Sequence, residues 1–183
     1  MTPDGKMPKD LAPGNKHLRL RGKKTERMCD ARSWSIKGVV MLGHESQTDV
    51  AEIQLKGIDG TWLSDANTAL TLSAALRNSI AELLGIQASE LGNDIRQASR
   101  PDGEVCQSIF LFDRNAAGYS TSIGRHLAKA LEETVNRMDC PKKCETSCPS
   151  CLMDYEQRFR ASRIDRHLGL AFLNKDWFER AGL

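Results

Sequence analysis

Four cysteines gather near the C-terminal end of the chain, in the stretch CPKKCETSCPSC that runs from Cys140 to Cys151. Their sulfurs could form disulfides, hold a structural metal ion or carry a reactive cofactor. Thiolates are soft ligands, and four of them can enclose a zinc ion in a closed tetrahedron. The short spacings let one loop wrap an ion, and Lys142 and Lys143 would offset the double negative charge of a zinc tetrathiolate. We therefore expect one zinc ion, with the ligands Cys140, Cys144, Cys148 and Cys151.

Disulfides are the less favoured explanation, because the sequence shows no sign of export. No apolar run is long enough to span a bilayer, and the first residues, MTPDGKMPKD, lack the apolar stretch of a signal peptide. We expect a cytoplasmic protein without a membrane partner, in which thiols stay reduced. Cys29 and Cys106 are then free thiols, and the apolar surroundings of Cys106 predict a place in the core.

An iron–sulfur cluster is the second explanation, since it also takes four cysteine thiolates. The part CETSCPSC has the C-x3-C-x2-C spacing of radical SAM enzymes, but those enzymes carry it near the start of a long barrel. Here it lies near the end of a chain of 183 residues, and Cys140 offers a fourth ligand. A zinc ion with four thiolates has no open position for water, so we expect no catalysis by the metal.

The stretch GYSTS, from Gly118 to Ser122, is a second candidate for chemistry. It follows a predicted buried strand and precedes a predicted helix, as a nucleophile elbow does, but Ser122 stands where that motif needs a glycine. We interpret it as a tight turn in which Ser120 or Thr121 caps the helix. An enzyme that uses Ser120 or Ser122 is a minor hypothesis. The sequence has neither a phosphate-binding loop nor an acidic metal-binding motif, so this chain cannot hydrolyse ATP by the usual mechanism. We expect that it is not an enzyme.

Charge is unevenly distributed along the chain. Residues 1–40 hold ten Lys and Arg against four Asp and Glu, whereas the remainder holds sixteen against twenty. A basic segment before a mildly acidic body is typical of contact with nucleic acid or an acidic partner, and a solvated tail explains it equally well. We interpret residues 1–33 as a basic flexible leader and residues 34–183 as a zinc-binding α+β domain.

Lys and Arg side chains are the candidates for contact with nucleic-acid phosphates. They are Arg19, Arg21, Lys23, Lys24 and Arg27 in the leader, and Lys142, Lys143, Arg158, Arg160 and Arg163 around the cysteines. Aromatic residues make up only 5% of the chain, which argues against an extended platform for stacking bases. Tyr119, Tyr155 and Phe159 are the few that could stack, and we expect Phe159 in the core instead.

Two β-hairpins are predicted from alternation and turn residues. The first joins residues 34–42 to residues 49–57. The second joins residues 94–99 to residues 104–113 through the turn RPDG, and its apolar run at residues 109–112 is typical of a buried central strand.

Helices are predicted between and after these strands from apolar residues at helical spacing. One begins near Asn67 and ends at Gly85, a second begins near Ser120 and ends before the cysteines, and Ile164, Leu168 and Phe172 mark a last one. The order predicts an α+β fold: two β-hairpins with packed helices, and a C-terminal four-cysteine zinc knuckle followed by helices.

The segments LGHESQTDV, TLSAALRNSIAELLGI, IFLFDRNAAGYS, CPKKCETSCPSCL and RIDRHLGLAFL together resemble the MrfA-type zinc-binding domain, over about residues 36–174. The most specific element is the four-cysteine run followed by Ile164, Asp165 and Arg166. This family occurs at the C-terminus of superfamily 2 DNA helicases, and in helicase-associated proteins of anti-phage systems such as DISARM and Druantia. Ala116 and Ala117 stand where its strand-to-helix loop usually has two glycines.

The resemblance implies zinc on the four cysteines and a role beside a helicase motor that acts on DNA. We expect a non-catalytic accessory domain or subunit of a DNA helicase, for DNA repair or anti-phage defence. Its partners would be a separate helicase motor or defence-system subunit, and single-stranded DNA. Family members usually carry the domain behind a motor or a long N-terminal region, whereas this chain has only a short leader. We therefore expect a stand-alone subunit or the C-terminal remnant of a split gene. The alternative is a protein-interaction module with purely structural zinc and no DNA contact.

Overall fold

The computed structural model describes residues 17–18, 28–29, 45, 47–101, 103–115 and 117–183. The chain divides after residue 46 into two units. In the first, the short strands β1 (His17–Leu18) and β2 (Met28–Cys29) pair antiparallel. The predicted strand at residues 34–42, the predicted domain boundary after residue 33 and the basic side chains of residues 19–27 lie outside the described residues.

The second unit, residues 47–183, is built on an antiparallel sheet of β3 (Val50–Ile53), β4 (Leu91–Ser99) and β5 (Val105–Asp113). The strand order is β3-β5-β4, so the prediction of a central strand at residues 109–112 is confirmed. The predicted hairpin of β4 and β5 is also confirmed, although β4 begins at Leu91 rather than at residue 94. β3 pairs with β5 over four residues, from Val50 opposite Phe112 to Ile53 opposite Ile109.

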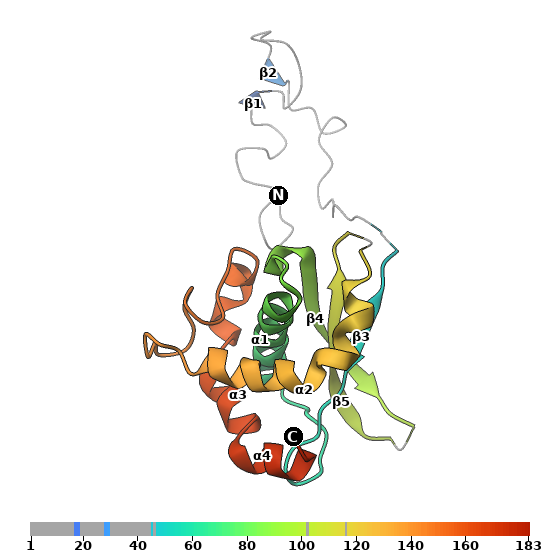
Figure 1. The fold of residues 1–183 in the computed structure, drawn as a ribbon. Helices are drawn as coiled ribbons and strands as arrows, with labels where there is room; N and C mark the ends of the chain where they lie inside the picture. The colour runs from blue at the N-terminus through green and yellow to red at the C-terminus, as the bar shows by residue number, and fades with distance from the viewer. Residues whose placement is uncertain (1–16, 19–27, 30–44, 46, 102, 116) are drawn as a thin grey trace. The chain divides into compact units, whose positions relative to one another are not determined.

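Helix α1 (Ala66–Leu84) lies at the centre of this unit (Figure 1). Its residues 68–77 are buried without interruption, and most of them are Ala, Leu, Ser or Thr. Such a helix packs on all sides, because small side chains allow neighbouring elements to approach closely. The side chain of Asp65 caps its first turn. Gly85 ends the helix in the left-handed conformation with a φ of 68°, so the predicted end at Gly85 is confirmed.

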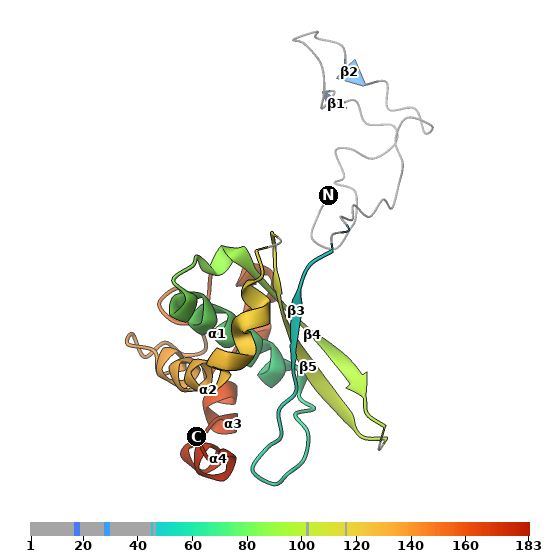
Figure 2. The same ribbon diagram turned by 45° about the vertical axis from the view of Figure 1, so that its right-hand side comes forward.

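The other helices are α2 (Tyr119–Met138), α3 (Arg166–Phe172) and α4 (Lys175–Ala181). Together with α1 they lie on one side of the sheet (Figure 2). Ile109 and Leu111 of β5 point to this side and join the buried core with Leu72, Leu76 and Ile80 of α1. α4 packs on the loop after β3 through Trp177, whose indole N–H donates to the Lys56 carbonyl at 2.7 Å.

The opposite face of the sheet has no helix over it among the described residues. Val50, Phe110 and Phe112 lie there and line a hollow of about 530 Å³ together with Asp94 and Arg96. In the described part of the chain, no helix is long and apolar enough to cross a membrane. The predicted α+β fold, with the cysteines near the C-terminus and helices after them, is confirmed.

Candidate metal centre

The four cysteine sulfurs converge to a single point. All four Sγ atoms lie within 4.8 Å of one another. The Cys140–Cys148 pair is 3.6 Å apart, the Cys144–Cys151 pair 3.7 Å and the Cys148–Cys151 pair 3.8 Å. Four thiolates that bind one zinc ion tetrahedrally at about 2.3 Å are separated by about 3.8 Å. The donor set and its spacing therefore fit one zinc ion.

Two tight turns bring these sulfurs together. The first follows directly after α2, where the Lys143 amide donates to the Cys140 carbonyl at 2.9 Å and Lys143 takes a left-handed φ of 47°. In the second, the amides of Cys151, Leu152 and Met153 all donate to the Cys148 carbonyl, at 3.0 to 3.1 Å. Because both turns are local, the short spacings in the sequence are sufficient to form them.

Backbone amides and burial shift the pKa of the cysteine thiols in opposite directions. The amide of Cys144, together with that of Lys142, lowers the pKa of the Cys140 thiol to about 6. Burial raises the pKa of Cys144 to about 12 and also raises that of Cys151. The amide of Cys148 donates to the Cys151 sulfur at 3.2 Å. A bound cation would favour the thiolate at every position, so metal binding would release protons.

Arg166 holds this loop in place, a role that spacing and composition did not reveal. Its side chain is only 7% exposed. Its Nε donates to the Cys144 carbonyl at 2.8 Å, its Nη1 to the Met138 carbonyl at 3.3 Å, and its backbone amide to the Thr146 carbonyl at 2.8 Å. Asp165 caps α3 beside it by accepting from the His167 amide at 2.9 Å. The sequence signal was the Ile-Asp-Arg motif after the cysteines.

A second buried arginine joins α1 to the segment after the cysteines. Arg77 is fully buried and pairs with Asp154 and, at 2.9 Å, with Glu156. Arg114 pairs with the same Glu156 oxygen at 2.6 Å. Burial lowers the pKa of Arg77. Sequence reasoning missed this group, because a charged residue in the apolar pattern of α1 gives no indication of its partner.

The predicted phosphate contacts around the cysteines fall into two groups. Lys143, Arg160 and Arg163 already bond to Asp139, Asp94 and Asn67 respectively, at 2.6 to 3.1 Å. Among the residues that the structure describes, Lys142 and Arg158 have no acidic partner, and both are exposed. The predicted contacts in the leader, residues 19–27, lie outside the described residues.

The stretch GYSTS is a helix start, but its cap differs from the prediction. Asp113, at the end of β5, accepts from the amides of Tyr119 and Ser120 at 2.8 Å each. The Ser120 hydroxyl donates to the same carboxylate at 2.7 Å, and Ser122 donates to the Tyr119 carbonyl at 2.7 Å. The prediction that Ser120 or Thr121 caps the helix is therefore wrong, because the Asp113 carboxylate of the preceding strand accepts the hydrogen bonds of the first helix amides.

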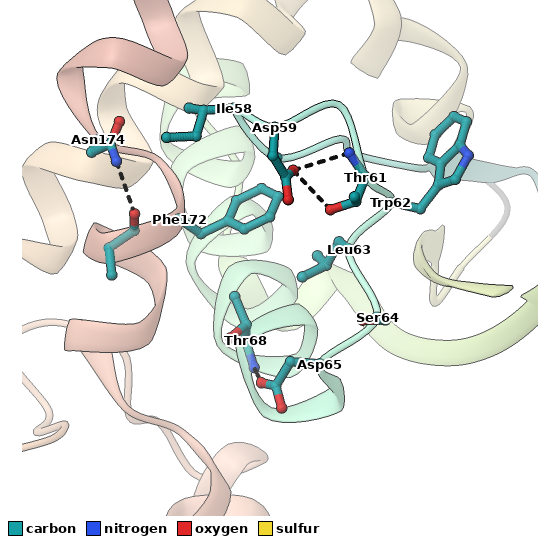
Figure 3. A pocket seen from close by; sticks show the side chains of 12 residues that line it. Ile58, Asp59, Thr61, Trp62, Leu63, Ser64, Asp65, Thr68, Phe172 and Asn174 are labelled. Carbon is teal, nitrogen blue, oxygen red and sulfur yellow. Dashed lines mark hydrogen bonds between the residues drawn. The ribbon is translucent and has the colours of Figure 1, made fainter. Parts of the chain in front are cut away.

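A separate hollow of about 310 Å³ lies between the loop at residues 57–65 and the end of α3 (Figure 3). Its polar groups serve local structure. Asp59 accepts from the Thr61 amide and hydroxyl at 3.0 and 2.7 Å, and Asp65 accepts from the Thr68 amide at 2.6 Å. These hydrogen bonds lower the pKa of both carboxyl groups. They support a turn and a helix cap, so the cysteine loop is the stronger candidate site.

Known proteins resemble the chain in this region. Residues 72–152, which include all four cysteines, match the family described as the MrfA Zn-binding domain. The Druantia protein DruE of Escherichia coli (strain UMEA 4076-1) is 26% identical over 167 residues, which cover 82% of this chain and 9% of DruE. The crystal structure of DUF1998 helicase MrfA bound to DNA matches 58% of this chain and 14% of its own, with 17% identity and a TM-score of 0.43.

The matched residues run from Leu72 in α1 through β4, β5 and α2 to the end of the cysteine loop, and β3 lies before them. They overlap the helix, strand and cysteine segments on which the resemblance in the sequence rests, residues 71–86, 109–120 and 140–152, and they contain the converged sulfurs. Over residues 72–152, the chain is therefore similar to the MrfA Zn-binding domain.

Proposed function

We propose that this chain is a non-catalytic zinc-binding accessory domain or subunit of a DNA helicase, which contacts DNA and docks on the helicase motor. Cys140, Cys144, Cys148 and Cys151 hold one zinc ion in this proposal. The ion stabilises the fold, because four thiolates leave no position open for a substrate. A role in anti-phage defence is supported by the similarity to DruE, and a role in DNA repair is the other pathway open to such a subunit.

The observation that carries the proposal is the spacing of the four sulfurs inside the matched zinc-binding region. Three of the sulfur pairs are 3.6 to 3.8 Å apart and all four sulfurs lie within 4.8 Å of one another, which leaves room for one ion between them. An iron–sulfur cluster would need space for several iron and sulfide atoms among the same thiolates. The geometry therefore favours a single ion over a cluster.

DNA contact is supported by cations around the cysteine loop. Lys142 and Arg158 are exposed and have no acidic partner in the described part of the chain. Lys143, Arg160 and Arg163 are also exposed in part. A DNA phosphate could replace the acidic or amide side chains to which they are bonded. Such contacts would give affinity that is independent of base sequence and falls with salt.

Fluorescence anisotropy with labelled DNA at increasing salt tests this binding. We expect the parent to bind at low salt. For single strands, the slope of log affinity against log salt should become shallower by about 0.7 for each phosphate that a variant no longer neutralises. The variant Lys142→Ala/Lys143→Ala should show this change. Lys129→Ala, which removes an exposed cation from α2, is the matched control and should bind like the parent. Absence of binding to both single and double strands at low salt would contradict the DNA role.

The alternative function, a protein-interaction module with purely structural zinc, is favoured by the open face of the sheet. Val50 is 52% exposed there, beside the half-buried rings of Phe110 and Phe112. The anisotropy measurement separates the two functions, since this module would not bind DNA at any salt concentration.

A further inference from the structure

Tyr155 and Phe159 are the most exposed large apolar side chains in the described part of the chain. Tyr155 is 73% exposed and Phe159 is 64% exposed, so the prediction that Phe159 lies in the core is wrong. Tyr155 follows the cysteine loop, and Phe159 lies in the 3-10 helix η3 (Gln157–Arg163). Two aromatic rings left in water contribute little to folding, and neighbouring exposed rings often mark a binding site.

The backbone under these rings is fixed, which keeps them from turning inward. Gln157, between the two rings, is only 2% exposed, and its side-chain amide donates to the Asn93 side chain at 2.7 Å. Asp154 accepts from the backbone amides of Glu156 and Gln157 at 2.8 and 3.0 Å. Because Gln157 and the backbone amides of this segment are held by these hydrogen bonds, the side chains of Tyr155 and Phe159 point toward solvent.

Arg158 lies over both rings. Its guanidinium carbon is 3.5 Å from the centre of the Tyr155 ring and 4.4 Å from that of Phe159. Cation–π attraction at these distances orders all three side chains. Among the described residues Arg158 has no acidic partner, so its charge is available to a ligand.

The surrounding charge is positive. The segment YEQRFRASR, residues 155–163, holds three arginines and one acidic residue, Glu156. Glu156 is already paired with Arg77 and Arg114. Arg160 is paired with Asp94, which leaves Arg158 as the arginine beside the rings without an acidic partner among the described residues. A ligand at this place would therefore meet aromatic faces and the charge of Arg158, and this combination fits the bases and phosphates of a nucleic acid.

We infer that Tyr155, Arg158 and Phe159, here called the aromatic–arginine cluster, form a stacking site for unpaired bases of single-stranded nucleic acid. The inference rests on the proposed DNA contact and makes it specific. Exposed aromatic rings stack on bases of any sequence, and the neighbouring arginines bind the phosphates between them. A duplex keeps its base faces stacked inside the helix, so the cluster would prefer single strands.

Three DNA probes of equal length and label test this inference by fluorescence anisotropy: an oligothymidine, the same backbone with abasic sites, and a duplex. The parent chain should bind the oligothymidine about tenfold more tightly than the abasic strand, because the abasic strand offers no base for the rings to stack on. The variant Tyr155→Ala/Phe159→Ala should bind the oligothymidine about tenfold or more weakly, and should no longer distinguish it from the abasic strand.

Two control variants separate loss of rings from other effects. Tyr155→Phe keeps the ring and should bind oligothymidine like the parent. Val105→Ala shortens an apolar side chain that is 42% exposed on β5, and should also bind like the parent. All variants should keep the parent's zinc content and melting temperature, because the rings make few contacts with the core.

The outcomes distinguish the two proposals. If the parent binds DNA but prefers neither bases over abasic sites nor single strands over duplex, the stacking site is overturned and the DNA role stands. The same holds if Tyr155→Ala/Phe159→Ala binds oligothymidine as tightly as the parent. If the parent binds none of the three probes, the proposed DNA contact itself is overturned, and with it the stacking site.

Discussion

Arg166 shows how one residue connects the cysteine loop to the rest of the domain. Its three hydrogen bonds end on the carbonyls of Met138, Cys144 and Thr146, which lie before and inside the loop. Metal ligands keep their geometry when neighbouring residues fix the backbone that carries them. Arg166 therefore holds the loop in the shape that places the four sulfurs around one point.

Replacing Arg166 by Met should loosen the loop. The carbonyls of Cys144 and Met138 would lose a charged donor in a buried place, at a cost of about 3 kcal/mol in the free energy of unfolding. We expect a lower melting temperature and faster transfer of zinc to a chromogenic chelator. Arg163→Met, which removes an exposed arginine bonded to Asn67, should change both quantities little. Equal zinc transfer from the two variants would refute the role of Arg166.

Sequence reasoning singled out the four cysteines whose sulfurs lie together, but it misplaced Phe159. The physical reason is the length of the sequence pattern that each feature leaves. The cysteine turns are local, so spacing alone indicates that the sulfurs can converge. Phe159 lies in a 3-10 helix of seven residues, in which only Gln157 is buried. So short a segment has no apolar period that would distinguish an inward ring from an outward one.

At the scale of elements, Asp113 connects the sheet to α2. Its carboxylate is 1% exposed and accepts from two amides at the start of α2 and from the Ser120 hydroxyl. The helix start is thus fixed by the last residue of β5, which precedes Gly118 in the chain. Sequence reasoning sought the cap next to the helix, because most caps are local, and it could not know the direction of the Asp113 side chain.

Asp113→Ala should destabilise the domain by about 2 kcal/mol. The substitution removes the buried acceptor of the first amides of α2 and of the Ser120 hydroxyl. Thr121→Ala is the matched control. The Thr121 hydroxyl is exposed and donates to the Gly118 carbonyl, so its removal should cost well under about 1 kcal/mol. Urea denaturation of both variants measures the difference, and a larger loss for Thr121→Ala would contradict this assignment of the cap.

The packing of α3 on the end of α2 depends on Gly169. A Cβ atom at this position would come within 2.3 Å of the Met138 sulfur, which is fully buried. Gly169→Ala should therefore destabilise the domain by about 1–3 kcal/mol through overpacking. Gly124→Ala in α2 has open space around it and should instead stabilise by about 0.5–1 kcal/mol. Thermal unfolding of the two variants should show shifts of opposite sign.

The elements themselves were largely predictable. α1 and β5 carry long apolar patterns, and Gly85 and the RPDG turn mark their ends. The early start of β4 at Leu91 was not predictable, since Gly92 and Asn93 have weak strand propensity. Pairing explains it: Gly92 lies opposite Phe112, whose ring covers the space that a Cβ atom would take.

At the scale of the whole molecule, the cysteine loop is part of the core rather than an appendage. Cys140, Cys151 and Leu152 are buried in the same cluster as Leu72 and Ile80 of α1. Arg77 ties α1 to Asp154 and Glu156 just after the loop. Loss of the metal would therefore loosen the loop and the packing of α3, because structural zinc contributes directly to the free energy of folding.

Cys148→Ser should remove the metal and at least unfold the region after residue 138. We expect a lower melting temperature and loss of amide hydrogen-exchange protection in that region, and chelation of the parent should have the same effect. Cys106→Ala is the control, because Cys106 is a buried cysteine of β5 outside the cluster, and this variant should keep its zinc. A melting curve unchanged by chelation would contradict a structural role for the metal.

The most direct test of the account is the metal content of the purified chain, measured together with its X-ray absorption spectrum. We expect one zinc ion per chain, bound by four sulfur atoms at about 2.3 Å, and no visible colour. Iron with a broad visible absorption band would contradict it and indicate an iron–sulfur cluster. Zinc bound by fewer than four sulfurs would contradict the closed site and leave a position free for catalysis.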